Sequence, residues 1–134
     1  MTVASAVLAV QRAIFGTLTG DPELMARVSG VFDEVPEDAE FPYVVIGEAT
    51  STPRNTLNGY GRETVVTLHV WSQYKGFTEA LEIADRITGL LDHQPLEVPG
   101  HTHIATRFEF SETLRDSDPR IRHVPLQFRV VTEQ

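Results

Sequence analysis

The apolar residues of the chain fall into two segments of helical spacing, and each segment predicts an amphipathic helix. In residues 3–18, apolar side chains recur every three or four positions after Thr2, a plausible N-cap. In residues 76–92, a similar apolar stripe lies opposite a row of charged side chains. The first stripe consists of Val3, Val7, Val10, Ile14 and Leu18, widened by Leu8 and Phe15. The second consists of Phe77, Ala80, Leu81, Ala84, Ile87, Leu90 and Leu91, with Glu79, Glu82, Asp85 and Arg86 expected to face outward.

A short helix is predicted between these two, because Asp21 can cap it and Pro22 suits its first position. It should end before Gly30.

Runs rich in β-branched residues predict the strands. In residues 62–74, the clearest run, Val66, Leu68 and Val70 take one face by alternation. The opposite face carries Val65, Thr67, His69 and Trp71, a mixture that suits partial cover by another subunit. Further strands are predicted at residues 31–35, 43–50, 95–98, 101–113 and 121–134. Pro125 lies inside the last strand, which predicts an edge position or a bulge there.

Residues 51–61 join the two best strands and are rich in glycine, proline, asparagine and threonine. They predict a connection longer than a tight hairpin needs, and long loops on compact domains are often functional. We expect Arg54 to be a charged contact of this loop and Leu57 and Tyr60 to be apolar contacts.

Taken together, the elements predict an α+β fold, a mainly antiparallel sheet with two amphipathic helices packed on one face. A chain of 134 residues without repeats or linkers is expected to form a single domain, residues 1–134.

Composition narrows the partners of the protein. The net charge of −8 disfavours nucleic-acid binding by phosphate neutralisation, and it suits an anionic membrane surface poorly. The absence of cysteine excludes disulfides and thiolate chemistry. Because the first residues lack a basic leader and a long apolar block, we expect an intracellular setting at synthesis, without a signal peptide.

His101 and His103 form the one pattern that resembles a metal site. If Ile104, Thr106, Phe108 and Phe110 point to the core, both histidines share the outer face with Ala105, Arg107 and Glu109. Two ligands are too few for a closed zinc site, and His69, His93 or His123 would have to supply a third from elsewhere in the chain. We therefore interpret the pair as strand-surface residues and expect no catalytic residue, metal or cofactor.

Other polar groups have simple structural interpretations. The chain lacks a nucleophile elbow, a zincin helix and a phosphate loop. The acidic residues of the loop after residue 32 lack the spacing of a calcium loop, and we interpret them as solvated: Asp33, Glu34, Glu37, Asp38 and Glu40. Arg115, Asp116, Asp118 and Arg120 form a turn of mixed charge. Three of these, Arg115, Asp118 and Arg120, are candidate interface residues.

Three segments in order carry a resemblance to a known family: "PYVVIGEATSTP", "TLHVWSQYKGFTEALEIADRITGLLD" and "RFEFSETLRDSDPRIRHVPLQFRVVTEQ". With them the whole chain resembles the tail completion proteins of long-tailed phages and gene transfer agents, also called tail-to-head joining or tail terminator proteins. The most specific parts are residues 69–72 with Gly76, Glu79 and Ala80, and the last strand after residues 118–120.

The resemblance implies a virion structural protein at the head-proximal end of the tail. Such a subunit forms a ring, typically of six copies, that ends tube assembly and joins the tail to the head connector. Its implied partners are further copies of itself, the tail tube protein and the head-completion protein, and DNA passes through the ring without specific binding. Two alternatives from other classes are a small metal-dependent hydrolase that uses His101 and His103, and a monomeric binding module of the host.

Overall fold

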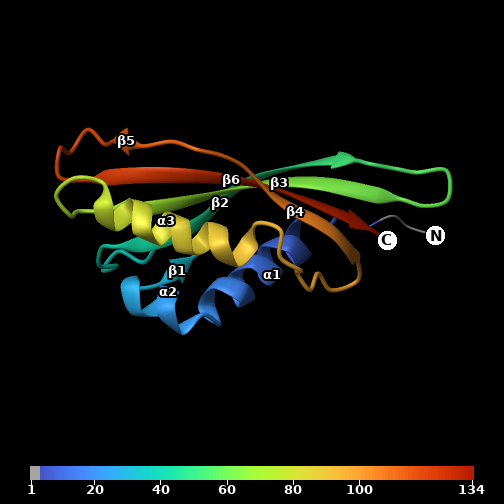
Figure 1. Ribbon diagram of the computed structural model, residues 1–134, viewed down its shortest axis with the longest axis horizontal. Coiled ribbons are helices and arrows are strands. Elements are labelled where there is room, and N and C mark those ends of the chain that lie inside the picture. The colour runs from blue at the N-terminus through green and yellow to red at the C-terminus, as the bar shows by residue number, and fades with distance from the viewer. Residues whose placement is uncertain (1–3) are drawn as a thin grey trace.

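The computed structural model describes residues 4–134, and it shows one face of a long, twisted sheet covered by helices (Figure 1). The helices are α1 (Val7–Thr19), α2 (Pro22–Arg27) and α3 (Thr78–Leu91). The strands are β1 (Val31–Phe32), β2 (Tyr43–Pro53), β3 (Gly61–Ser72), β4 (Thr102–Ser111), β5 (Leu114–Arg115) and β6 (Arg122–Glu133). The predicted α+β class is confirmed. Among the described residues, no helix is long and apolar enough to cross a membrane.

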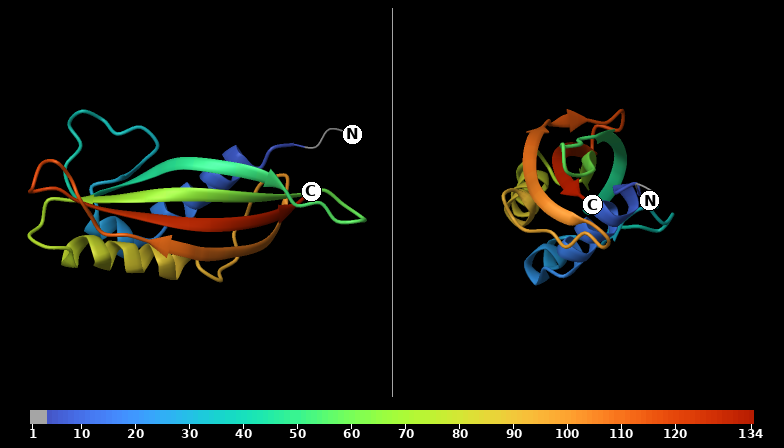
Figure 2. Two further views of the ribbon diagram at one scale, coloured as in Figure 1. Left: turned by 90° about the horizontal axis from the view of Figure 1, so that it is seen from above. Right: turned by 90° about the vertical axis from the view of Figure 1, so that its right-hand side faces the viewer.

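The sheet has the order β1-β2-β3-β6-β4, with β5 beside the first residues of β6. All pairs are antiparallel except the short pair β1–β2. Strands β3 and β6 stay in register without a break, from Gly61 opposite Glu133 to Ser72 opposite Arg122. This unbroken central ladder makes the molecule long in the strand direction, with β2 and β4 along the two sides (Figure 2).

The core lies between the sheet and the helices. Alternate residues of the central strands point toward the helices and are buried, among them Val66, Leu68, Val70, Leu126, Phe128 and Val130. The predicted inner face of residues 62–74 is therefore confirmed. Burial of such side chains is the main stabilising contribution, at roughly 25 cal/mol per Å² of apolar surface removed from water.

Helix α1 begins at Val7 with Ala6 as N-cap, and the predicted cap Thr2, with Val3, lies outside the described residues. Val10, Ile14 and Leu18 are buried as predicted. Leu8 and Phe15 are instead 56% and 44% exposed, so the prediction that they widen the buried stripe is wrong. The sheet contacts only a narrow face of this helix, which leaves those two side chains on its outer flank.

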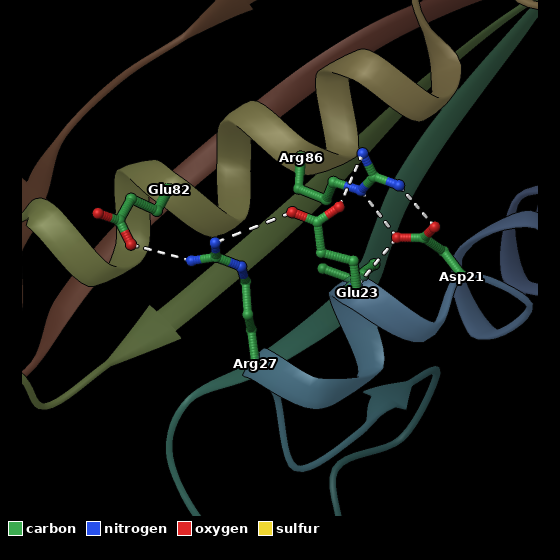
Figure 3. Close-up of polar contacts among 6 residues, drawn as sticks. Asp21, Glu23, Arg27, Glu82 and Arg86 are labelled. Atoms are coloured by element: carbon green, nitrogen blue, oxygen red, sulfur yellow. Dashed lines mark hydrogen bonds and ion pairs between the residues drawn. The ribbon is translucent and has the colours of Figure 1, made fainter.

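Helix α2 begins as predicted, with Pro22 at its start and Asp21 as its cap: the Asp21 carboxylate accepts a hydrogen bond from the Leu24 N–H at 2.9 Å. The same carboxylate accepts two bonds from the Arg86 guanidinium of α3, at 2.7 and 2.8 Å (Figure 3). This guanidinium holds the pKa of Asp21 below its usual value, helped by the Leu24 N–H. Arg86 does not simply face outward, as its polarity predicted, because it links α3 to α2.

A second contact between these helices joins Arg27 to Glu82 at 2.9 Å (Figure 3).

The buried stripe of α3 differs from the predicted one at two positions. Ala80, Ala84, Ile87 and Leu91 are buried as expected, and Phe77 and Leu90 are half-buried. Ile83 is also buried, whereas Leu81 is 38% exposed. The stripe is rotated toward Ile83 because α3 contacts β3, β6 and β4 together.

Several strand boundaries also differ from the prediction. The first strand stops at Phe32, and residues 95–98 form no strand, although Leu96 and Val98 are buried in the core. Strand β2 extends to Pro53, so much of the predicted loop 51–61 belongs to the ladder and only residues 54–60 connect the strands.

Pro125 lies neither at an edge nor in a bulge, since β6 is bonded on both sides. Its carbonyl accepts the Glu112 N–H at 3.2 Å, just where β4 has ended at Ser111 and β5 has not yet begun at Leu114. The missing N–H of proline therefore faces a break in the neighbouring ladder, where a donor is not needed.

Candidate functional site

The tip of the β2–β3 hairpin, residues 54–60, carries three of the predicted interface residues. Leu57 is fully exposed, and Tyr60 and Arg54 are also exposed. Backbone hydrogen bonds nonetheless hold the tip in place. The Arg54 N–H donates to the Gly61 carbonyl at 2.9 Å, and the Gln134 N–H donates to the Tyr60 carbonyl at 2.9 Å. A side chain at Gly61 would collide with the Arg54 carbonyl, which explains the glycine. The hairpin thus presents apolar groups to solvent from a defined backbone.

The other three predicted interface residues lie at the end of β5 and in the turn that follows it: Arg115 is the last residue of β5, and Asp118 and Arg120 lie in the turn between β5 and β6. Asp118 pairs with Arg120 at 2.8 Å and accepts the Arg120 N–H at 3.0 Å. The Arg120 guanidinium, with this N–H, lowers the pKa of Asp118 to about 2. Asp118 therefore braces the turn, while the side chains of Arg120 and Arg115 are exposed.

The structure does not bring these two groups together. The hairpin tip follows the Gly61–Glu133 end of the central ladder, and the turn precedes the Ser72–Arg122 end. Twelve paired residues separate them, which corresponds to about 37 Å along the strands. We name these ends the hairpin pole (residues 54–60) and the turn pole (residues 115–120), and they lie at opposite ends of the molecule (Figure 1).

His101 and His103 do not share a strand face as predicted. His101 precedes β4, and the register of β4 shifts between His103 and Ala105. The Nε2 atom of His103 lies 2.7 Å from the Thr106 hydroxyl. Burial, followed by the charge of Arg107, lowers the pKa of His103. In the described part of the chain, no three histidine or acidic side chains are grouped as metal ligands.

The predicted inner face of β4 is confirmed for two residues and wrong for two. Thr106 is buried, and Phe108 is 37% exposed but lies edge-on against the buried Phe128, with ring centroids 5.8 Å apart. Ile104 and Phe110 are 51% and 46% exposed and do not point to the core. A second register shift, between Phe108 and Phe110, reverses the alternation once more. Because each bulge adds one residue to β4 against β6, a strict period of two cannot be followed through this strand.

A polar cluster that the sequence did not indicate lies on the outer face of the sheet, where β2, β3 and β6 meet. Glu48 Oε1 lies 2.7 Å from His69 Nε2, and His69 Nδ1 lies 2.7 Å from His123 Nε2. The His123 ring stacks on Trp71 at 3.8 Å between centroids. A side chain at Gly47 would approach the His69 ring to 2.6 Å, so the glycine makes room for it.

One tautomer assignment satisfies both contacts. In it, His69 donates from Nε2 to Glu48 and accepts the Nε2–H of His123 at its Nδ1. Burial, followed by the charge of His69, lowers the pKa of His123, while Asp116 and Glu48 act in the opposite direction. The cluster is a braced, half-buried part of the outer face, which is otherwise a mixture of apolar and polar side chains as predicted.

Comparison with known proteins shows one family over nearly the whole chain. The family model "Tail completion protein gp17" matches residues 12–133. Tail completion protein gp17 of Bacillus phage SPP1 is 32% identical over 131 residues, which are 96% of each chain. The solved structure of SPP1 gp17 covers 93% of this chain and 89% of its own, with a TM-score of 0.67 and 30% identity. A chain in the virion of a native gene transfer agent particle shares the fold at a TM-score of 0.90 and 23% identity, covering 98% of this chain and all of its own.

Proposed function

The chain belongs to the family of phage tail completion proteins, and from this membership we propose that it forms a ring of six copies at the head-proximal end of a tail. There the ring ends the assembly of the tail tube and joins the tail to the head connector. The full-length match to a tail completion protein carries this proposal. The protein acts in the virion after synthesis in the host cytoplasm.

The shape of the subunit supports a joining role. A protein that connects two structures needs a separate contact surface for each, and the hairpin pole and the turn pole lie at opposite ends of one rigid ladder. We propose that one pole contacts the tail tube protein and the other contacts the head-completion protein. Arg54, Leu57 and Tyr60 act at the hairpin pole, and Arg115, Asp118 and Arg120 at the turn pole.

The charge of the subunit supports passage of DNA through the ring. A net charge of −8 repels the phosphate backbone, so DNA would gain little from releasing counterions on contact. The proposal includes no catalytic step: His103 is already hydrogen-bonded to Thr106, and the bulge after it separates it from the predicted face.

Deletion of the gene from the particle-producing genome tests the proposal. The expected result in electron micrographs is full heads and separate tails, with tubes of variable length, and no infectious or transducing particles. Expression of the wild-type chain from a plasmid should restore joined particles. Normal particles in the deletion strain would contradict the proposal.

A further inference from the structure

Two exposed apolar patches lie at opposite sides of the sheet. The first, named the α1 patch, consists of Leu8, Arg12 and Phe15 on the outer flank of α1, which packs against β1 and β2. The second, named the β4 patch, consists of Phe110 near the end of β4 and Glu112 just after it, at the other side. Strands β3 and β6 separate the two patches, because β1 and β2, which contact α1, lie at one end of the strand order and β4 lies at the other (Figure 2).

The α1 patch is hollow. Its three residues line a pocket of about 380 Å³ together with Gln11, Asp33 and Ile46 of the adjacent segments. Leu8 and Phe15 are seven positions apart, so they lie on one flank of the helix about 10 Å apart, with Arg12 between them. Arg12 is the one charged residue of α1, and it forms no ion pair with any residue that the structure describes.

The β4 patch projects side chains but offers little free backbone. On the open side of β4, the Phe108 N–H donates to Asp92 at 2.9 Å and the Thr106 carbonyl accepts the His93 N–H at 2.9 Å. These bonds block the addition of another strand at this point. Contact at this edge is therefore expected through exposed side chains, of which Phe110 is the large apolar one. Glu112, two residues further on, has no ion pair within residues 4–134.

We propose that the β4 patch of one copy docks on the α1 patch of the next copy, and that this contact closes the ring. Two different patches on opposite sides are what head-to-tail association requires, whereas a two-fold dimer would join one patch to itself. Phe110 and Glu112 are two positions apart, about 7 Å along the chain, and Phe15 and Arg12 are three positions apart, about 5 Å along α1. The charges also match, because Glu112 of one copy reaches Arg12 of the next.

This inference rests on the proposed ring, and charge reversal tests it in the purified protein. Arg12→Glu and Glu112→Arg should each abolish ring formation in sedimentation and native mass spectrometry, while circular dichroism shows an unchanged fold. The double variant Arg12→Glu with Glu112→Arg should recover rings, because the pair is restored with opposite polarity. Asp85→Arg, a reversal on the exposed surface of α3, should form rings as the wild type does.

A second measurement does not require the rings to survive purification. Because the chain has no cysteine, Arg12→Cys with Glu112→Cys places two unique thiols on the two patches. A short bismaleimide added to assembled particles should give a ladder of linked copies on a denaturing gel. Arg12→Cys with Asp85→Cys should give none.

The outcomes separate this interface from the proposed function. If both single variants, Arg12→Glu and Glu112→Arg, form rings as the wild type does, the proposed interface is wrong and the proposed ring stands. The same holds if particles with the two patch thiols give no ladder. A ladder in particles that contain the cysteine variant, together with normally joined heads and tails in the deletion strain, would leave the interface and overturn the joining role.

Discussion

Individual residues on the outer face acquire their roles from strand register. His69 and His123 are 54 positions apart in the sequence. The pairing of β3 with β6 nevertheless brings the Nδ1 atom of His69 to 2.7 Å from the Nε2 atom of His123. Gly47 then leaves room for His69, and Trp71 supports His123 by stacking. No spacing in the sequence indicates such a group, because its members come from three strands.

The His123 ring makes stability depend on pH. Its pKa in the folded protein lies below the value near 6.5 of an unfolded chain, chiefly because it is half-buried. As the pH falls below about 6.5, the unfolded state therefore binds a proton first, and the free energy of unfolding decreases until the folded pKa is passed. In the variant His123→Gln, the free energy of unfolding should therefore decrease less between pH 7 and pH 5 than in the wild type. Urea denaturation at both pH values measures this difference.

Some pH dependence should remain in that variant, because burial also lowers the pKa of His103. An identical slope in wild type and His123→Gln would show that this ring does not contribute.

The sequence predicted the exposure of some candidate interface residues but not the geometry around them. Exposure of Leu57 and Tyr60 followed from a polar, glycine-rich segment. The histidine pattern at residues 101–103 attracted attention by its spacing, but His101 precedes β4 whereas His103 lies in it. Asp118 was predicted as an interface residue, and its carboxylate in fact braces a turn through Arg120.

At the scale of elements, the sequence predicted which segments are helical or extended but not which flank each element buries. Alternation located β3 correctly, since its ladder has no bulge against β6. It failed for β4, where two bulges change the side of every later residue. In α3 the apolar stripe is wide, and only the position of the sheet decides that Ile83 is buried and Leu81 is not.

A pair of truncations in α3 tests that assignment. Ile83→Ala removes buried methyl groups from the core, so the free energy of unfolding should fall by about 2–5 kcal/mol. Leu81→Ala changes a side chain that is already partly in water, and it should cost roughly 1 kcal/mol or less. Chemical denaturation of both variants gives the comparison, and a larger loss for Leu81→Ala would place the opposite flank of the helix in the core.

At the scale of the whole molecule, our proposal assigns different contacts to the two directions of the sheet, across the strands and along them. Across the strands, the β4 patch and the α1 patch face neighbouring copies. Along the strands, the two poles lie at opposite ends of the sheet (Figure 1), where we propose that they contact other components. This division allows contacts within the ring and contacts with the tail or head to be changed separately.

The hairpin pole provides the sharpest test of this separation. Residues 54–61 can be replaced by the two-residue turn Asn-Gly. This turn would connect Pro53 with Arg62, which form the last pair of the β2–β3 ladder at this end. No core residue is removed, so the shortened protein should melt cooperatively and still form rings. It should nevertheless fail to restore joined particles in the deletion strain, because Leu57 and Tyr60 are missing.

A matched variant separates length from side-chain chemistry at this pole. Arg54→Ser, Leu57→Ser and Tyr60→Ser together keep the full hairpin and its backbone hydrogen bonds, including the bond from the Gln134 N–H to residue 60. If the exposed side chains make the contact, this triple variant should be as defective in joining as the shortened one. Joined particles from the triple variant alone would mean that the backbone of the tip makes the contact, and joined particles from both would show that the hairpin pole has no part in assembly.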